Sequence, residues 1–343
     1  MVRAVLVTLR NYEGVGVSDC SLGGLFCCDE ISHGLIWLSV FVTRLSLLAR
    51  LNVLVQKDEE VMFLLTVVGL VVVLVIFFAT DSLFVFYIFF EVRRVLIFFV
   101  ICGWGCWPER LQAGKYIVLY MVVASLPLLV YVIYLFFIRG RGRFVIFCAN
   151  GSVVMYDRFV VFLAMRAAFL VKSPMYGVHL WLPKAHVEAS VGGSMMLAGV
   201  LLKLGGYGLV RFGWFLGFFN SVVFSCIICL CVFGGVVASV VCCAQIDSKC
   251  LIAYSSIGHM RLVVGGLMCG SWVGLGGSVI LMLGHGLSSC GMFFLVGDIY
   301  KLYGSRMLFV IRGGVGGLLG ISFWLVLMCG LNAGVPVSLK FFW

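Results

Sequence analysis

Charged residues are scarce in this chain of 343 residues, at 11% of the total, whereas an average soluble domain has about 25%. Hydrophobic residues make up 63%. A water-facing surface cannot be built from so few charges, so a soluble globular protein is excluded. The apolar runs are continuous rather than alternating, which excludes a transmembrane β-barrel. The composition therefore predicts an all-α polytopic membrane protein.

Long hydrophilic segments are also lacking, which leaves no room for a soluble domain between spans. A transmembrane helix needs about 20 apolar residues. By this rule we expect ten helices, at residues 34–55, 61–80, 82–101, 115–138, 159–173, 192–212, 215–243, 249–269, 272–298 and 314–334. The polar connections are then 56–60, 108–114, 139–158 and 301–312. We expect one transmembrane helical domain over residues 1–343, with an irregular segment over about the first 30.

Targeting and orientation signals are weak. Arg3 and Arg10 interrupt the early apolar stretch, so no secretory signal is predicted. Basic residues fall on both alternating sets of loops, which leaves the orientation in the membrane open. The net charge of +10 is scattered without a basic stripe, which favours anionic lipid headgroups over nucleic acid as the partner.

Motifs for nucleotides, metals and redox centres are missing. The chain has no P-loop, no Rossmann fingerprint and no four-cysteine cluster motif. Cys226 and Cys229 form a CxxC without a second pair, and the 15 cysteines lie mostly in apolar runs, as small buried hydrophobic residues do. His186-Val187-Glu188 matches the H-x-E of zinc deaminases, but their P-C-x-x-C is absent. We therefore expect no cofactor and no metal in this chain.

Proline and histidine are rare, at 5 residues each, whereas glycine (42), phenylalanine (30) and cysteine (15) are abundant. The abundant residues are spelled by codons rich in T and G. Such strand bias is typical of small organellar genomes, which indicates mitochondrial coding.

Two segments predict helices that break inside the membrane. The run 159–173 ends in Lys172-Ser173-Pro174, and a short apolar piece at 176–182 ends at Pro183. A second break is expected at 330–336, which holds two glycines, an asparagine and a proline. Broken helices are tolerated at membrane depth where they are buried in protein or line a wet cavity, and transporters use them to place helix ends near ions.

Five ionisable residues fall within the predicted spans or at the first break: Glu91, Lys172, Lys203, His259 and His285. Such residues are costly at membrane depth and usually functional. Bridged by water held at Ser255, Ser256, Ser288 and Ser289, they would form a proton wire. A structural interpretation stays open for each one, since Glu91 could pair with Arg94 on the same helix face and an isolated histidine could bind a neighbouring helix.

A long segment, residues 169–211, reads FLVKSPMYGVHLWLPKAHVEASVGGSMMLAGVLLKLGGYGLVR. It closely resembles the family of subunit 4 of mitochondrial NADH–ubiquinone oxidoreductase, respiratory complex I. The similarity covers roughly residues 28–343. Shorter segments also match the family, in the same order along the chain: Pro108-Glu109-Arg110, Ser125-Leu126-Pro127-Leu128, Asp247-Ser248-Lys249 and His285-Gly286-Leu287-Ser288-Ser289.

The resemblance implies an antiporter-like subunit in the membrane arm of complex I, in the mitochondrial inner membrane. The family fold is a bundle of fourteen helices with inverted repeats and broken helices, of which about ten are expected here. NADH, flavin, iron–sulfur clusters and ubiquinone are then handled by other subunits, and the partners are membrane-arm subunits, especially neighbouring antiporter-like ones. Carried over by motif, the proton-transfer residues are Glu91, Lys172, Lys203, His259 and His285.

The sequence also departs from the family pattern. Arg93 and Arg94 follow the acid at Glu91, and Arg261 replaces a small residue. About two N-terminal helices are lacking, and the family's second glutamate would fall at or beyond Trp343. We interpret the chain as a fragment or an incorrect gene model rather than a reduced subunit. Two other functions stay open: a subunit of a multisubunit cation/proton antiporter, and a structural subunit with a degenerate channel.

Overall fold

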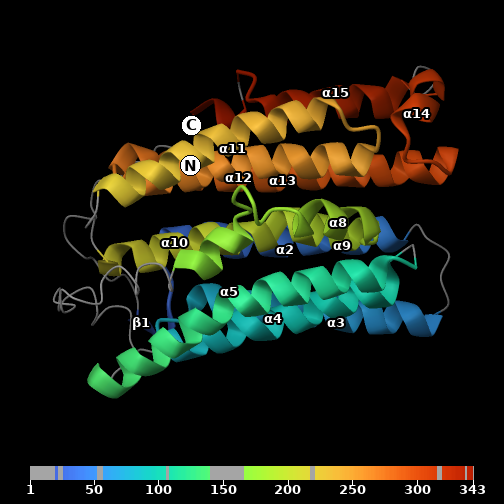
Figure 1. Ribbon diagram of the computed structural model, residues 1–343. Helices are drawn as coiled ribbons and strands as arrows, with labels where there is room; N and C mark the ends of the chain where they lie inside the picture. Colours follow the sequence, from blue (N-terminus) through green and yellow to red (C-terminus); the bar gives the residue numbers. More distant parts are fainter. Residues whose placement is uncertain are drawn as a thin grey trace.

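The computed structural model describes residues 20–21, 26–51, 57–105, 108–139, 166–216, 221–314, 319–336 and 338–342. Nearly all of them are helical (Figure 1). The long helices are α2 (Glu30–Leu51), α3 (Lys57–Ala79), α4 (Leu83–Trp104), α5 (Arg110–Arg139), α10 (Leu202–Leu216), α11 (Ser221–Cys243), α12 (Ser248–Met268), α13 (Trp272–Tyr303) and α15 (Leu319–Ala333). The shorter elements are β1 (Cys20–Ser21), β2 (Phe26–Cys27), α8 (Trp181–Glu188), α9 (Val191–Met196), η3 (Leu197–Leu201), α14 (Leu308–Gly314) and η5 (Leu339–Phe342).

The predicted all-α membrane bundle is confirmed. Among the described residues, seven helices are long and apolar enough to cross a membrane, and α9, η3 and α10 together form one of them. Helix α4 has the length but carries three charged residues, Glu91, Arg93 and Arg94. Helix α15 is apolar but has 15 residues. Of the predicted span at 159–173, the structure describes residues 166–172, which are helical.

The helices lie side by side as a bundle, with α3, α4 and α5 along one side and α11 to α15 along the other (Figure 1). Between these groups lie α2, α8, α9 and α10. The span Val191–Phe212 is buried along its whole length, whereas only 17% of the α11 span is buried. The described part of the bundle is therefore built around the span that carries Lys203.

Two glycines allow this central span to be packed on all sides. A Cβ atom on Gly199 would lie 2.6 Å from Cys290 Sγ of α13 and 2.9 Å from Val42 of α2. A Cβ atom on Gly205 would lie 2.9 Å from the backbone nitrogen of Ser173. Small residues permit close helix packing in membranes, where apolar surface alone drives little association.

Both predicted helix breaks are present. Residues 166–172 are helical, 173–180 are mostly turns, and α8 starts at Trp181. The predicted end at Pro183 is wrong, because Pro183 is the third residue of α8. The first-turn N–H groups have no partner within the helix, so proline is tolerated there. At the second break α15 ends at Ala333, and Gly334 adopts φ = 87° before η5.

Several predicted boundaries need correction. The first turns of α3 and α5 are formed by residues that were expected in connections, Lys57–Glu60 and Arg110–Gly114. The reason is that a helix end at the membrane surface accepts polar residues. Helix α13 continues to Tyr303, five residues beyond the predicted end. The expected irregular segment lies mostly outside the described residues, as does nearly all of the connection 139–158.

Candidate proton pathway

The centre of the bundle holds a direct contact between two of the predicted residues. Lys203 of α10 and His285 of α13 are both fully buried, and the distance from Lys203 Nζ to His285 Nδ1 is 2.9 Å. The other ring nitrogen of His285 is buried and has no hydrogen-bond partner among the described residues. An amine and an imidazole in this geometry can share one proton.

A π-helical turn, η3, positions Lys203. It spans Leu197–Leu201 and interrupts the α-helical run directly before α10. The Lys203 amine donates a hydrogen bond to the carbonyl oxygen of Ala198, five residues earlier. Single π-helical turns occur often at functional sites. Sequence reasoning did not predict this turn, because no residue type marks it in the way that proline marks a break.

His259 lies beside His285. The two ring centroids are 5.4 Å apart with the planes inclined by 47°, and His259 is half-buried on α12. The structure thus brings together Lys203, His285 and His259, from three different helices, as the wire hypothesis requires.

Lys172 lies at the end of the helical segment 166–172 and is buried. Its Nζ atom is 2.6 Å from the centroid of the Phe90 ring, a cation–π arrangement. Glu91, Arg93 and Arg94 of α4 all act electrostatically on this amine. The first break therefore places a lysine against a charged cluster that lies on a single helix.

Glu91 forms an ion pair with Arg94, one helical turn further on, as predicted. Glu91 and Lys172 do not form an ion pair in the described structure at the 4.0 Å limit. The reason is local, since Arg94 shares the helix face of Glu91 and reaches it first.

The two other arginines that depart from the family pattern are buried. Arg93 Nη2 donates a hydrogen bond to the Phe90 carbonyl oxygen at 3.2 Å. Arg261 Nε donates to the carbonyl oxygen of Pro174 at 3.2 Å, and its guanidinium carbon is 5.6 Å from the centre of the Tyr176 ring. Arg261 thus ties α12 to the first break.

A small cavity of about 30 Å³ separates Lys172 from the π-helical turn. It is lined by Arg93, Arg94, Lys172, Trp181, Leu197 and Leu201, among others. The volume exceeds the about 10–15 Å³ that one water molecule needs, although apolar side chains form most of the lining. A water molecule there would have Lys172, Arg93 and Arg94 as its polar neighbours, between Lys172 and the turn that carries Lys203.

Lys340 is a buried lysine that sequence reasoning missed. Its Nζ atom donates to the carbonyl oxygen of Asn332 at 3.0 Å and also to the Asn332 side-chain oxygen. Ser288 donates to the same side-chain oxygen at 3.1 Å. The signal was present, because Lys340 follows a glycine- and proline-containing break in an apolar run, as Lys172 precedes one.

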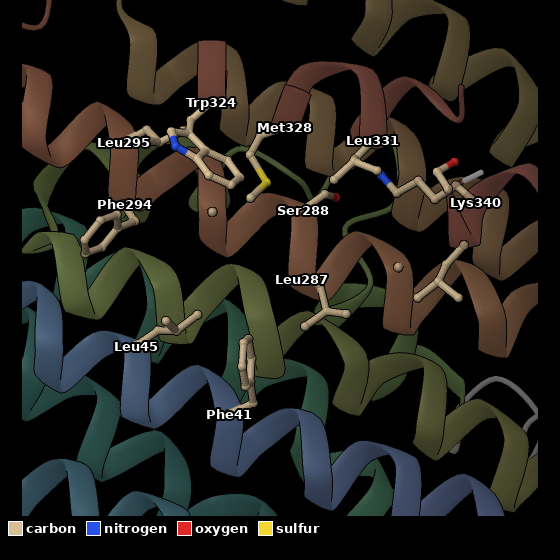
Figure 2. Close-up of a pocket in the computed structure, with 14 residues that line it drawn as sticks. Phe41, Leu45, Leu287, Ser288, Phe294, Leu295, Trp324, Met328, Leu331 and Lys340 are labelled. Atoms are coloured by element: carbon tan, nitrogen blue, oxygen red, sulfur yellow. The ribbon is translucent and has the colours of Figure 1, made fainter. Parts of the chain in front are cut away.

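Lys340 and Ser288 also line an apolar groove of about 650 Å³ between α2, α13, α15 and η5. Figure 2 shows Lys340 at one end and Phe294, Leu295 and Trp324 at the other.

The four serines predicted to hold water already have acceptors for their hydroxyl protons. Three of them donate to a backbone carbonyl three residues earlier, at 2.6 to 3.3 Å: Ser255, Ser256 and Ser289. Ser288 has two acceptors in reach of its one proton, the Asn332 side-chain oxygen at 3.1 Å and the His285 carbonyl oxygen at 3.4 Å. A water molecule at such a hydroxyl would act as the donor. The expectation that they hold water stays a prediction.

Metal-binding clusters are absent from the part of the chain that the structure describes, where no three His, Cys, Asp or Glu side chains gather in one place. Cys226 and Cys229 are free and exposed.

Comparison with known proteins places the chain in a family. Residues 80–343 match the family model described as NADH:quinone oxidoreductase/Mrp antiporter, TM, and residues 2–77 match NADH-ubiquinone oxidoreductase chain 4, amino terminus. The chain belongs to the NADH-ubiquinone oxidoreductase chain 4 family. A relative of that name from Ceratitis capitata is 44% identical over 312 residues, which are 91% of this chain and 69% of the relative.

Solved structures support the fold. Respiratory complex I from Thermus thermophilus contains a chain that matches with a TM-score of 0.81 and 23% identity, over 99% of this chain and 76% of that one. A chain of the Mrp complex from Dietzia sp. matches with a TM-score of 0.78 and 20% identity, over 92% of this chain and 35% of that one. The antiporter-like fold predicted for the chain is confirmed.

Proposed function

We propose that Glu91, Lys172, Lys203, His285 and His259 transfer protons across the membrane. The observation that supports this function best is the contact of 2.9 Å between the buried Lys203 amine and the His285 imidazole. Burying these two groups side by side is costly for a protein that uses them only for packing. A proton-transfer role accounts for their placement.

The family supplies the setting. The chain is a multi-pass membrane subunit of NADH:ubiquinone oxidoreductase and is located in the mitochondrial inner membrane. We propose that NADH, flavin, iron–sulfur clusters and ubiquinone are bound by other subunits. The partners we propose are membrane-arm subunits, above all neighbouring antiporter-like ones, together with membrane lipid and without nucleic acid. The described helices form part of one transmembrane domain in this proposal.

The transfer we propose starts with a change of partner at Glu91. When Glu91 leaves Arg94 and approaches Lys172, the carboxylate holds the proton on the Lys172 amine. When Glu91 returns to Arg94, the neighbouring Arg93 and Arg94 charges favour release of that proton to water in the 30 Å³ cavity. Lys203 accepts the proton and passes one to His285 Nδ1, and the free ring nitrogen of His285 passes one on toward His259.

The test is Lys203→Met in the assembled complex, which keeps the length of the side chain and removes its charge. Proton pumping per NADH oxidised, measured in proteoliposomes, should fall on the order of 10²-fold, the lower end of what a positioned proton-transfer group contributes. Lys301→Met is the matched control, because Lys301 is exposed and forms an ion pair with Asp298 on its own helix at 2.8 Å. Normal pumping in the Lys203 variant would overturn the proposal.

A second candidate function is cation/proton exchange. The family model matched by residues 80–343 includes Mrp antiporters, and the Mrp structure shares the fold. Proton movement driven by a Na⁺ gradient in the absence of NADH would favour this function.

A third candidate is a structural subunit, favoured by the buried Arg93 and Arg261 at the first break. Unchanged pumping in both Lys203→Met and Lys172→Met, with a stable complex, would support it.

A further inference from the structure

A polar crevice of about 310 Å³ opens where α5 and α12 begin and α8 ends. Its lining includes two acids, an amide, a lysine, a thiol and a phenol: Glu109, Glu188, Gln112, Lys184, Cys250 and Tyr254. The 650 Å³ groove, by contrast, is lined almost entirely by apolar side chains. The polar lining marks the crevice as a place for water.

Glu188 connects the crevice to the interior. It is 9% exposed, and its buried Oε2 atom has no hydrogen-bond partner in the part of the chain that the structure describes. Burial raises the pKa of the Glu188 carboxyl, the charge of Arg306 opposes this shift, and the charge of Glu109 adds to it. A buried carboxyl group beside a polar crevice is a candidate for exchanging protons with water.

His186 lies on the same short helix, two residues before Glu188, and faces the other way. It is fully buried, and its ring stacks on Phe293 of α13 with centroids 5.0 Å apart and planes inclined by 8°. No described residue forms a hydrogen bond with either ring nitrogen. A buried polar atom without a partner is costly, so packing against Phe293 does not explain a histidine at this position.

His186 interacts electrostatically with lysines from both neighbouring sites, the crevice at Glu188 and the Lys203–His285 contact. Lys249 and Lys203 act electrostatically on His186, and Lys249 also acts on Glu188. Lys249 is buried at the start of α12 and donates a hydrogen bond to the Ala189 carbonyl oxygen at 2.8 Å. His186 therefore lies between the crevice and the Lys203–His285 contact.

We propose that the crevice at Glu188 is a water-filled proton inlet and that His186 carries protons from it to the Lys203–His285 pair. This inference rests on the proposed function. In one transfer ionised Glu188 takes a proton from crevice water and gives it, through water, to one nitrogen of neutral His186. The other nitrogen of His186 then releases its proton toward the neutral Lys203 amine, which leaves Glu188 ionised and His186 neutral again. Water molecules complete the hydrogen bonds that both ring nitrogens lack.

The test compares two substitutions on the two sides of one ring stack. His186→Phe keeps a flat ring against Phe293 and removes both nitrogens, so the complex should assemble while pumping per NADH falls at least about tenfold. Phe293→Leu removes the stack and keeps the imidazole, so pumping should stay within about twofold of wild type. The opposite pattern, or normal pumping in His186→Phe, overturns the inference. His186→Gln, which cannot carry a proton, should lose pumping like His186→Phe.

Lys203→Met, measured in the same preparation, separates this inference from the proposed function. Lost pumping in Lys203→Met with normal pumping in His186→Phe would remove the inlet and leave the function in place. Normal pumping in both would remove the function itself.

Cysteine labelling tests separately whether water fills the crevice. Cys250 lines it, whereas Cys229 lies exposed on α11, away from the crevice lining. A positively charged methanethiosulfonate, which forms a mixed disulfide and releases sulfinate, should label Cys250 in the assembled complex and slow pumping. Cys250→Ser should resist this slowing, measured against its own untreated rate. Failure of the charged reagent to reach Cys250, when a membrane-permeant maleimide does, would overturn the inlet.

Discussion

The two helix breaks hold a buried lysine each but are fixed in different ways. At the first break, Pro174 is tied to Arg261 of α12, and Ser173 packs against Gly205 of α10. At the second, the backbone nitrogen atoms of Gly334 and Val335 donate to the Gly330 carbonyl oxygen of the helix that has just ended. The first break is therefore held by distant helices, and the second mainly by its own segment.

The two lysines differ accordingly. Lys340 donates to the backbone and the side chain of Asn332, so its amine is fixed. The Lys172 amine rests on the Phe90 ring, and no described residue accepts a hydrogen bond from it. An amine held by a ring and surrounded by movable charges can change partners. The comparison indicates that Lys172 acts in transfer and that Lys340 closes a helix end.

The largest expected effect tests this difference directly. Lys172→Met should lower proton pumping per NADH on the order of 10²-fold, because it removes a proton-transfer group. Lys340→Met should keep more than about half of the wild-type pumping, because it removes a fixed hydrogen-bond donor. Pumping in proteoliposomes measures both, and equal losses would contradict the comparison.

The next effect concerns packing at the breaks. Gly205→Ala should destabilise the protein by about 1–3 kcal/mol, because the new Cβ atom meets the Ser173 nitrogen at 2.9 Å. Gly330→Ala is the matched control, since its nearest neighbour, Val335, is 3.6 Å away. It should be neutral or slightly stabilising. The midpoint of thermal inactivation of the assembled complex measures the stability of both variants. A larger loss of stability in Gly330→Ala than in Gly205→Ala would disprove the claim that Gly205 is the more tightly packed position.

Removing Arg261 should weaken the first break alone. Arg261→Met leaves the Pro174 carbonyl oxygen buried without its donor, at a cost of about 1–3 kcal/mol. Limited proteolysis should detect faster cleavage near residues 173–180. Asn332→Leu, at the second break, should leave the rate of cleavage near residues 173–180 unchanged. Faster cleavage near residues 173–180 in this variant would show that the stability of the first break depends on the second.

The smallest effect should be equal at both breaks. Gly177 and Gly334 have φ angles of 93° and 87°, and the space around each is open or nearly so. Alanine at either position should cost about 1–2 kcal/mol through backbone strain alone. Thermal inactivation midpoints should shift alike. A markedly larger shift in Gly177→Ala would mean that the first break is the more constrained at its backbone as well.

Composition and run length predict the bundle and both breaks, because the membrane restricts the backbone to helices and makes each interruption conspicuous. They do not predict contacts between helices. The meeting of Lys203 with His285 depends on the packing of α10 against α13, and the pairing of Glu91 with Arg94 rather than Lys172 depends on which cation is nearer.

His186 shows a further limit of the sequence. Its pattern suggests a zinc motif that the chain does not complete, and its burial and unpaired nitrogens become visible only in three dimensions. Lys340 could have been found from the sequence, since it lies beside a break, as Lys172 does.

The π-helical turn before Lys203 differs from an ordinary helical turn by one extra residue. Deleting a single residue there would restore an ordinary α-helical turn, in which the Ala198 carbonyl oxygen that now accepts from Lys203 would bind a backbone N–H group instead. The gain or loss of one codon thus separates a helix that contains the π-helical turn from a regular transmembrane helix without it. A function that depends on such a step can appear or disappear in one genetic event while the surrounding bundle keeps its shape.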